Sequence, residues 1–246
     1  MPQNIGSRFI DETRFESLAP SDQSRGLPPP PLEAPWDSSA ETIDLPRRER
    51  IGVGKVNLTE AIHRRISVRE FSSAALALDE LCYLLLCTQG VRRVVPGSAT
   101  FRPVPSAGAR HAMETYLLVN RVKKLTAGLY RYLAIERKLL KLAEGAELAA
   151  RLTDACLGQD FVGASAVTFI WAADVYRMTW RYGQRGYRYL LLDAGHVCQN
   201  LYLAAEAVDA GVCAIGAYDD DKVNALVGLD GKDQFAIYLA AVGKRR

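Results

Sequence analysis

Apolar positions along the chain recur with two periods, and the longer period predicts several helices. Leucines at helical spacing predict a helix from Leu78 to Gln89. The longest such pattern runs from Gly186 to Ala210, and we expect Gly211 to end that helix as its C-terminal cap. Two further helices are expected, one opening at the capping-box pattern Asn57-Leu58-Thr59-Glu60 and one over residues 146–157.

Other segments have the length and composition of strands. The continuous apolar run 164–173 predicts a central strand buried on both faces. Residues 129–135 and 138–142, separated by Glu136-Arg137, predict a hairpin, and 114–122 and 235–242 predict two more strands. Because strands and helices do not alternate regularly, we expect an α+β fold.

The first 50 residues differ in composition from the rest of the chain. Eight of the eleven prolines lie within the first 46 residues, and Pro28 to Pro31 are consecutive. Such a run favours an extended polyproline II segment. We therefore expect a proline-rich arm over residues 1–50 and one folded domain over 51–246. The arm is interpreted either as a solvated linker or as a segment that wraps a neighbouring subunit.

Composition and charge exclude several classes of protein. With 49% hydrophobic and 24% charged residues, the chain has the composition of a soluble globular protein. We found no apolar span and no signal peptide, so we expect a cytoplasmic protein that does not enter membranes. A net charge of +3 is small for a protein that binds nucleic acid. Five cysteines without a Cys-x-x-Cys pair, and three scattered histidines, predict reduced core thiols and no metal site.

Arginine and aromatic residues alternate in one block, Trp180-Arg181-Tyr182-Gly183-Gln184-Arg185-Gly186-Tyr187-Arg188-Tyr189, which runs directly into Leu190-Leu191-Leu192-Asp193-Ala194-Gly195-His196-Val197-Cys198-Gln199-Asn200. From the residues alone, such a block fits an ion-paired surface, a site for a planar anionic cofactor, or a nucleic-acid surface.

This block resembles the WKYGxRGYRY and EAGHxxQN sequences of the flavin-dependent nitroreductase superfamily, in its SagB-type branch of thiazole/oxazole-forming dehydrogenases. The resemblance implies a nitroreductase-like fold, with a central, mostly antiparallel sheet flanked by helices, and an intertwined homodimer. It also implies FMN as the cofactor. The long helix has a face of small residues suited to close packing, either in such a dimer or in the core of its own subunit, namely Ala194, Gly195, Cys198 and Ala205.

Four segments resemble the flavin-binding motifs of that superfamily. Arg65-Ile66-Ser67-Val68-Arg69 resembles its RxSxR motif, which implies that Arg65, Ser67 and Arg69 grip the phosphate and ribityl chain. In an extended segment these three alternate side chains would point the same way. Lys244 and Arg246, after the last strand, are either further phosphate ligands or solvated.

The other two segments would contact the flavin ring. Pro105, Ser106, Ala107 and Gly108 match the PSAGA loop along the ring, although Ala112 stands where a proline usually follows His111. Residues 211–219 resemble GxGxxxIGxF(D), which implies ring contacts from Ile215, Gly216 and Ala217, with the Gly216 N–H meeting flavin N5.

The resembled enzymes carry a Lys-Tyr pair beside the flavin, and Arg181 and Tyr182 stand at the matching positions. An arginine stays protonated in proteins and is a poor base, whereas a tyrosine can donate a proton. We therefore expect an FMN-dependent oxidoreductase with Tyr182 and Arg181 as catalytic residues. NAD(P)H is a possible reductant, and the substrate is a small molecule or peptide. Azoline oxidation and flavin binding without turnover are the alternatives.

Overall fold

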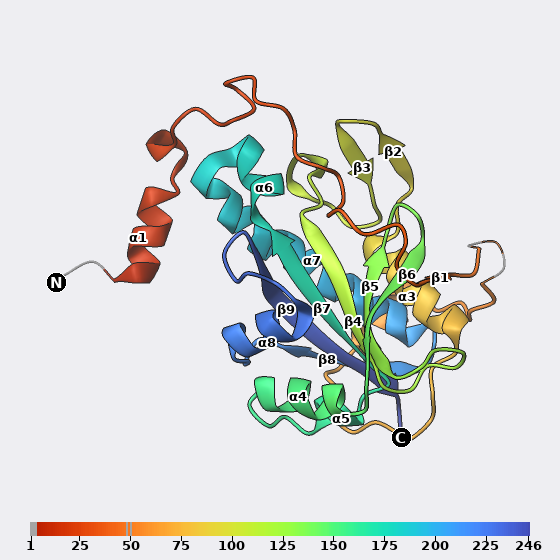
Figure 1. Ribbon diagram of the computed structural model, residues 1–246. Helices are drawn as coiled ribbons and strands as arrows, with labels where there is room; N and C mark the ends of the chain where they lie inside the picture. Colours follow the sequence, from red (N-terminus) through yellow and green to blue (C-terminus); the bar gives the residue numbers. More distant parts are fainter. Residues whose placement is uncertain (1–3, 48, 50) are drawn as a thin grey trace.

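One seven-stranded sheet forms the centre of the molecule in a computed structural model that describes residues 4–47, 49 and 51–246 (Figure 1). The strand order is β1-β6-β5-β4-β7-β9-β8, and every pairing between neighbours is antiparallel. The strands are β1 Thr42–Asp44, β4 Met113–Val119, β5 Gly128–Leu133, β6 Lys138–Glu144, β7 Val167–Asp174, β8 Ala210–Ile215 and β9 Gln234–Lys244; a separate hairpin pairs β2 Arg93–Val95 with β3 Ala99–Phe101. The predicted α+β fold with a mostly antiparallel sheet is confirmed.

Strand β7 lies between β4 and β9 and is buried on both faces, as its apolar run predicts. Its side chains alternate between two cores because successive residues of a strand point to opposite faces. Phe169 and Trp171 belong to one core, and Ile170 and Ala172 to the other. The sheet is therefore the middle of three layers.

Helices cover both faces of the sheet (Figure 1). Helices α3 (Leu78–Gln89) and α7 (Gly186–Glu206) pack against each other on one face, and α4 (Glu147–Ala155), α5 (Phe161–Ala164) and α8 (Asp220–Val227) pack on the other. The remaining helices are α1 Ile5–Glu12, α2 Leu58–Arg64 and α6 Val175–Tyr182. No helix in the described segments is long and apolar enough to cross a bilayer.

Local signals placed several elements correctly. Asn57 caps α2 and accepts hydrogen bonds from the backbone N–H groups of Thr59 and Glu60 at 2.8 and 3.4 Å. Helix α3 has the predicted bounds, and β5 and β6 form the predicted hairpin. Helices α1 and α6, strand β1, the β2–β3 hairpin and helix α8 were not predicted.

The end of the long helix differs from the prediction. Helix α7 stops at Glu206, and Ala210 begins strand β8, which pairs with β9. Gly211 is therefore a strand residue and not a helix cap. A Cβ atom on Gly211 would come within 2.5 Å of the Val68 side chain, so glycine allows the segment around Val68 to lie against β8.

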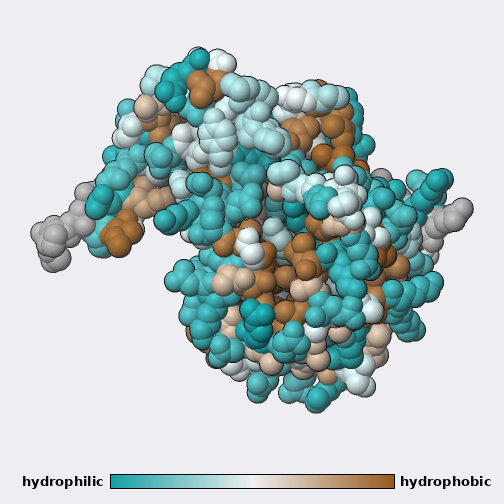
Figure 2. Space-filling model, viewed as in Figure 1, coloured by the Kyte–Doolittle hydropathy of each residue, from teal (hydrophilic) through white to brown (hydrophobic). Residues whose placement is uncertain are grey.

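The proline-rich arm lies on its own chain. Its strand β1 pairs with β6, and Gln23 N–H donates to the carbonyl of Trp180 at 2.9 Å. Ala34 is buried, and its N–H donates to Glu114 at 2.8 Å. Further along, Glu33 accepts hydrogen bonds from the N–H groups of Ala134 and Ile135 at 2.6 and 3.2 Å. Residues 22–46 are thus docked on α6 and the sheet. Helix α1 has no buried residue and projects from one side of the molecule (Figure 2), where Arg188 of α7 donates to the carbonyl of Ile10 and lies over the Phe9 ring at 5.9 Å from its centroid.

Glu33 makes the docking of the arm sensitive to pH. Burial, with the neighbouring carboxylates of Glu136 and Glu114, raises the pKa of Glu33 to about 7. The folded arm therefore holds this proton more tightly than the unfolded chain does, so its stability falls as pH rises from about 4.5 to about 7.

We predict that Glu33→Gln protects the arm above pH 7, because the amide keeps an acceptor oxygen and removes the charge. The backbone amides of Ala134 and Ile135 should have higher protection factors against hydrogen exchange in the variant than in wild type at pH 8. The two proteins should have equal protection factors near pH 5. A gain of ~1 kcal/mol in global stability would raise Tm by ~2–4 °C. Glu41→Gln, an exposed arm position, is the control. Equal protection in wild type and Glu33→Gln at pH 8 would contradict the assignment.

Candidate functional site

The segment that contains Arg65, Ser67 and Arg69 lies along the outer edge of the sheet. Ser67 forms a parallel bridge with Val212 of β8, and its hydroxyl lies 3.0 Å from that of Tyr202 on α7. The Arg65 guanidinium stacks on the Tyr202 ring at 5.2 Å from its centroid. Among the described residues, no carboxylate lies within 4.0 Å of Arg65 or Arg69. Two cations and a hydroxyl are thus available to an anion here.

The C-terminal residues reach the same region by different routes. Arg246 donates to the carbonyl of Phe71 and pairs with Glu70, both at 3.3 Å, next to Arg69 in the chain. Lys244 instead forms an ion pair with Glu80 at 2.6 Å and donates to the carbonyl of Val208 at 2.5 Å. Arg246 is therefore near the predicted phosphate motif, and both Arg246 and Lys244 already have a carboxylate partner within the chain.

Residues 215–217 follow β8 directly. Ile215 is buried and pairs with Leu239 of β9, whereas Gly216 and Ala217 are exposed. A Cβ atom on Gly216 would meet nothing within 4 Å. The backbone at Gly216 is accordingly open to a ligand.

The predicted ring loop is held in a constrained shape. Gly108 and Ala109 both have positive φ angles, of 56° and 53°. Ser106 Oγ accepts from the His111 N–H at 2.9 Å, and the Ala107 N–H donates to Asp193 at 3.3 Å. Burial raises the pKa of Asp193, and the hydrogen bonds from Ser106 and Ala107 oppose that rise. A non-glycine residue in the left-handed region is uncommon and marks a loop that its surroundings hold in place.

Arg181 and Tyr182 lie against this loop. A Cβ atom on Gly108 would overlap the Tyr182 hydroxyl and come within 3.0 Å of Arg181 Nε. Tyr182 packs edge-on against Tyr189 with ring centroids 4.8 Å apart. The two predicted catalytic side chains thus meet the predicted ring loop, and glycine at position 108 is what leaves room for them.

These residues form two groups on opposite sides of α7. The phosphate motif contacts Tyr202, whereas the ring loop contacts Asp193. Asp193 and Tyr202 are nine positions apart, which is ~13.5 Å and about two and a half turns along a helix, so their side chains point to opposite sides of it. One chain therefore does not bring the two groups together on one face of α7. Neither Asp193 nor Tyr202 was predicted, although Asp193 directly precedes Ala194-Gly195-His196 in the quoted block.

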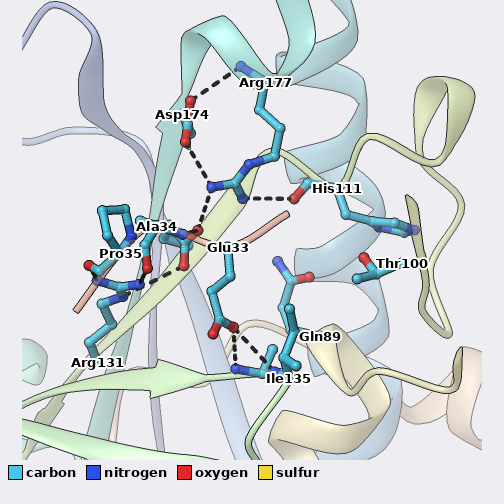
Figure 3. A network of polar contacts seen from close by, with 12 residues as sticks. Glu33, Ala34, Pro35, Gln89, Thr100, His111, Arg131, Ile135, Asp174 and Arg177 are labelled. Carbon is cyan, nitrogen blue, oxygen red and sulfur yellow. Dashed lines mark hydrogen bonds and ion pairs between the residues drawn. The ribbon is translucent and has the colours of Figure 1, made fainter. Parts of the chain in front are cut away.

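A network of buried ion pairs supports the ring loop (Figure 3). Arg177 of α6 is fully buried and pairs with Glu114 at 2.8 Å and Asp174 at 2.7 Å. It also donates to the carbonyl of His111 at 3.3 Å. Burial raises the pKa of Glu114, but Arg177 and Arg131 outweigh that effect and hold the pKa below its usual range. Glu114 is therefore ionised at neutral pH.

His111 follows the ring loop and is itself buried. Burial and three nearby arginines lower its pKa to about 3. Its imidazole is neutral at physiological pH and does not act there as a cationic acid.

The outer face of α7 carries two exposed leucines beside the polar His196 and Gln199. Of the residues considered for dimer packing, Ala194, Cys198 and Ala205 face the core of their own chain, so their predicted place in a dimer interface is wrong and the alternative of packing within one subunit holds; only Gly195 is exposed. Leu191 and Leu192 are 57% and 58% exposed on that outer face. Helix α2, which contacts α7, and the residues after it add three more exposed apolar side chains, Leu58, Ile62 and Ile66.

Two cavities open near these elements. The larger, about 510 Å³, lies beside α3 and the 49–53 segment and contains none of the predicted flavin residues. The smaller, about 430 Å³, is lined by Arg181, Tyr182 and the arm. Sequence patterns did not indicate either cavity.

The described residues contain neither a group of metal ligands nor a disulfide. Within the described ranges, no group of three or more His, Cys, Asp or Glu side chains could hold a metal ion. None of the five cysteines forms a disulfide. Burial raises the pKa of Cys82 to about 11 and of Cys156 and Cys198 to about 12, so these thiols stay protonated at neutral pH.

The sequence as a whole matches the Nitroreductase family over residues 62–244, and the chain belongs to that family. It is 31% identical over 193 residues to a protein of Methanocaldococcus jannaschii named provisionally as a nitroreductase, covering 78% of this chain and 93% of that protein. It is 27% identical to the trifolitoxin-processing protein TfxB of Rhizobium leguminosarum bv. trifolii, over 63% of this chain but 44% of that protein.

Solved structures share the fold. A nitroreductase-type protein from Anabaena variabilis superposes with a TM-score of 0.69 at 28% identity, over 85% of this chain and 42% of that chain. Another, from Desulfovibrio desulfuricans in complex with FMN, superposes with a TM-score of 0.55 at 15% identity, over 78% of this chain and 87% of that chain. The solved structures show the fold, and the family match makes the protein an oxidoreductase of a flavin-binding family.

We predict that Arg177→Met destabilises the fold by ~3–5 kcal/mol, because it leaves the buried Glu114 carboxylate without its closest partner. Chemical denaturation at pH 7 measures the loss. Arg151→Met, on the exposed face of α4, is the matched control and should change stability by less than ~0.5 kcal/mol. A loss below ~1 kcal/mol in Arg177→Met would show that the network is not a structural requirement.

Proposed function

We propose that the protein is an FMN-dependent oxidoreductase whose flavin binds between two copies of the chain. The observation that carries the proposal is the separation of the two groups of motif residues by α7. In a homodimer packed through the outer face of that helix, the phosphate-motif residues Arg65, Ser67 and Arg69 of one chain can meet the ring loop of the other. The exposed leucines of α7 supply apolar area for such packing.

The residues at the sheet edge fit the phosphate end of FMN. Arg65 and Arg69 have no carboxylate partner among the described residues, and Ser67 is exposed beside them. Charge-assisted bonds to phosphate are the strong class of hydrogen bond in proteins. Arg246 would have to leave Glu70, and Lys244 would have to leave Glu80, before either could join them.

The ring end of FMN fits the open backbone at Ile215, Gly216 and Ala217 in one chain and the loop Pro105, Ser106, Ala107, Gly108 in the other. When bound, FMN supplies the N5 atom that accepts and passes on hydride. Gly216 N–H would donate to that atom, Tyr182 would move any proton needed, and Arg181 would stabilise negative charge. NAD(P)H is the reductant we expect.

A second candidate is oxidation of azolines in a peptide. It is favoured by the likeness to the trifolitoxin-processing protein, although this chain spans less than half of that protein. Arg181 weighs against it, because an arginine cannot accept the proton that a lysine accepts in the resembled enzymes.

We predict that the recombinant protein carries about one FMN per chain and has a mass near twice the 27.1 kDa of one chain. In the double variant Leu191→Asp/Leu192→Asp, charges on the outer face of α7 should give monomers that have lost FMN. Light scattering and flavin absorbance measure both properties.

The control for that variant is Leu157→Asp, which changes a 66% exposed leucine at the end of α4. It should stay dimeric and yellow. A wild-type monomer that retains FMN would refute the two-chain site, and a wild type that takes up no added FMN would refute the flavoprotein assignment. FMN that stays bound without being reduced by NAD(P)H would favour a flavin-binding protein without turnover.

We also predict that Gly216→Ala weakens FMN binding by about tenfold, or ~1.4 kcal/mol, without changing thermal stability. The added methyl group meets only open space within the chain, so a loss of affinity would report contact with the ligand. Fluorescence titration of apoprotein with FMN gives the affinity. Unchanged affinity in the variant would remove Gly216 from the flavin site.

A further inference from the structure

The smaller cavity lies between the N-terminal arm and the Arg181–Arg185 segment. Phe15, Leu18 and Pro20 belong to its arm side, and Arg181, Tyr182 and Arg185 to its domain side. Its volume of about 430 Å³ falls in the range of small-molecule sites. The arm side lies outside the 62–244 range of the family match.

This cavity adjoins the predicted ring loop through two side chains. Tyr182 and Arg181 both line the cavity, and both lie where a side chain on Gly108 would stand. A molecule in the cavity would therefore be next to a flavin ring lying along that loop. This step rests on the flavin site proposed above.

The arm side of the cavity is anchored at both ends. Before it, Arg185 Nη1 donates to the carbonyl of Thr13 at 2.9 Å, and Arg188 Nε donates to the Thr13 hydroxyl at 2.6 Å. After it, Trp180 Nε1 donates to the carbonyl of Leu27 at 3.0 Å. Tyr176 also donates to Asp22 at 2.9 Å. Residues 15–23 are thus held against α6 and the start of α7.

The lining of the cavity favours an anion joined to an apolar body. It contains two arginines and no acidic side chain. Within the part of the chain that is described, no carboxylate lies within 4.0 Å of Arg181 or Arg185. Arg185 is partly engaged with Tyr189 and Thr13, which leaves the exposed Arg181 as the more available cation. A guanidinium binds a carboxylate through two parallel hydrogen bonds, and Phe15, Leu18 and Pro20 offer apolar contact.

We propose that this cavity binds the organic electron acceptor, that it selects small aromatic carboxylates, and that residues 15–23 of the arm determine this specificity. Arg181 pairs with the carboxylate, and Leu18 packs against the aromatic ring. Arg181 is then a substrate-binding residue rather than a base.

The test compares 4-nitrobenzoate with the neutral 4-nitrobenzamide as acceptors for the FMN-loaded protein. In each case NAD(P)H gives a hydride, solvent gives a proton, the nitro group becomes a nitroso group, and one water is released. We expect kcat/KM to favour the carboxylate by about tenfold or more, mainly through KM. Arg181→Gln should collapse that ratio toward one, and Arg181→Lys should restore part of it.

Two further measurements separate a specific site from a general loss. Leu18→Trp fills the cavity and should raise KM for both acceptors by about tenfold, while Ile5→Trp, an 86% exposed arm position outside the cavity, should not. Benzoate, which cannot be reduced, should bind to wild type in calorimetry and not to Leu18→Trp. The benzoate readout does not depend on turnover.

The failure of this proposal can be distinguished from failure of the flavin site. If the loaded enzyme reduces both acceptors with equal kcat/KM, and benzoate does not bind, the acceptor site is refuted while the oxidoreductase stands. If the protein takes up no FMN but binds benzoate in a Leu18-dependent way, the cavity stands as a carboxylate site and the flavin proposal fails.

Discussion

The buried ion pair between Arg177 and Glu114 is the interaction on which the arrangement of the site depends. Both side chains are almost fully out of water, which is costly unless every charge is paired. Arg177 pairs with two carboxylates and donates to the carbonyl of His111. Glu114 pairs in addition with Arg131 and accepts a hydrogen bond from the N–H of Ala34. One pair therefore ties α6, the end of the ring loop, three strands of the sheet and the arm to each other, so a local disturbance would reach all of them.

Helix α7 organises the rest by separating two sets of functional residues. Its contacts with the phosphate motif and with the ring loop are half a turn apart, and the helix is too well packed on the sheet to rotate. The proposed two-chain flavin site follows from this separation, because a cofactor that contacts both sets would take them from two chains. The exposed leucines on the outer face of the same helix are the surface proposed for the dimer.

Sequence periodicity predicted the elements whose pattern has a single interpretation, such as α3 and β7. It carried the long helix past Glu206 to Ala210 and did not predict strand β8, because the small residues there fit a helical pattern as readily as a strand. The motif residues came from resemblance, whereas Asp193 and Tyr202, which position two of those motifs, had no independent signal. The docking of the arm could not be predicted, because Ala34 and Glu114 are 80 positions apart and meet only in the folded chain.

Arg181 changes what this site can do compared with the enzymes it resembles. A lysine in an apolar site can lose its proton and act as a base, but an arginine remains a cation and can only attract negative charge. At the same position the chain places a cavity with an apolar arm on one side and no acidic lining. In the acceptor site that we propose, the arginine and the arm act together, because the arginine attracts an anion and the arm offers apolar contact. Tyr182, which lies against the ring loop and lines the cavity, is the proton donor in the same proposal.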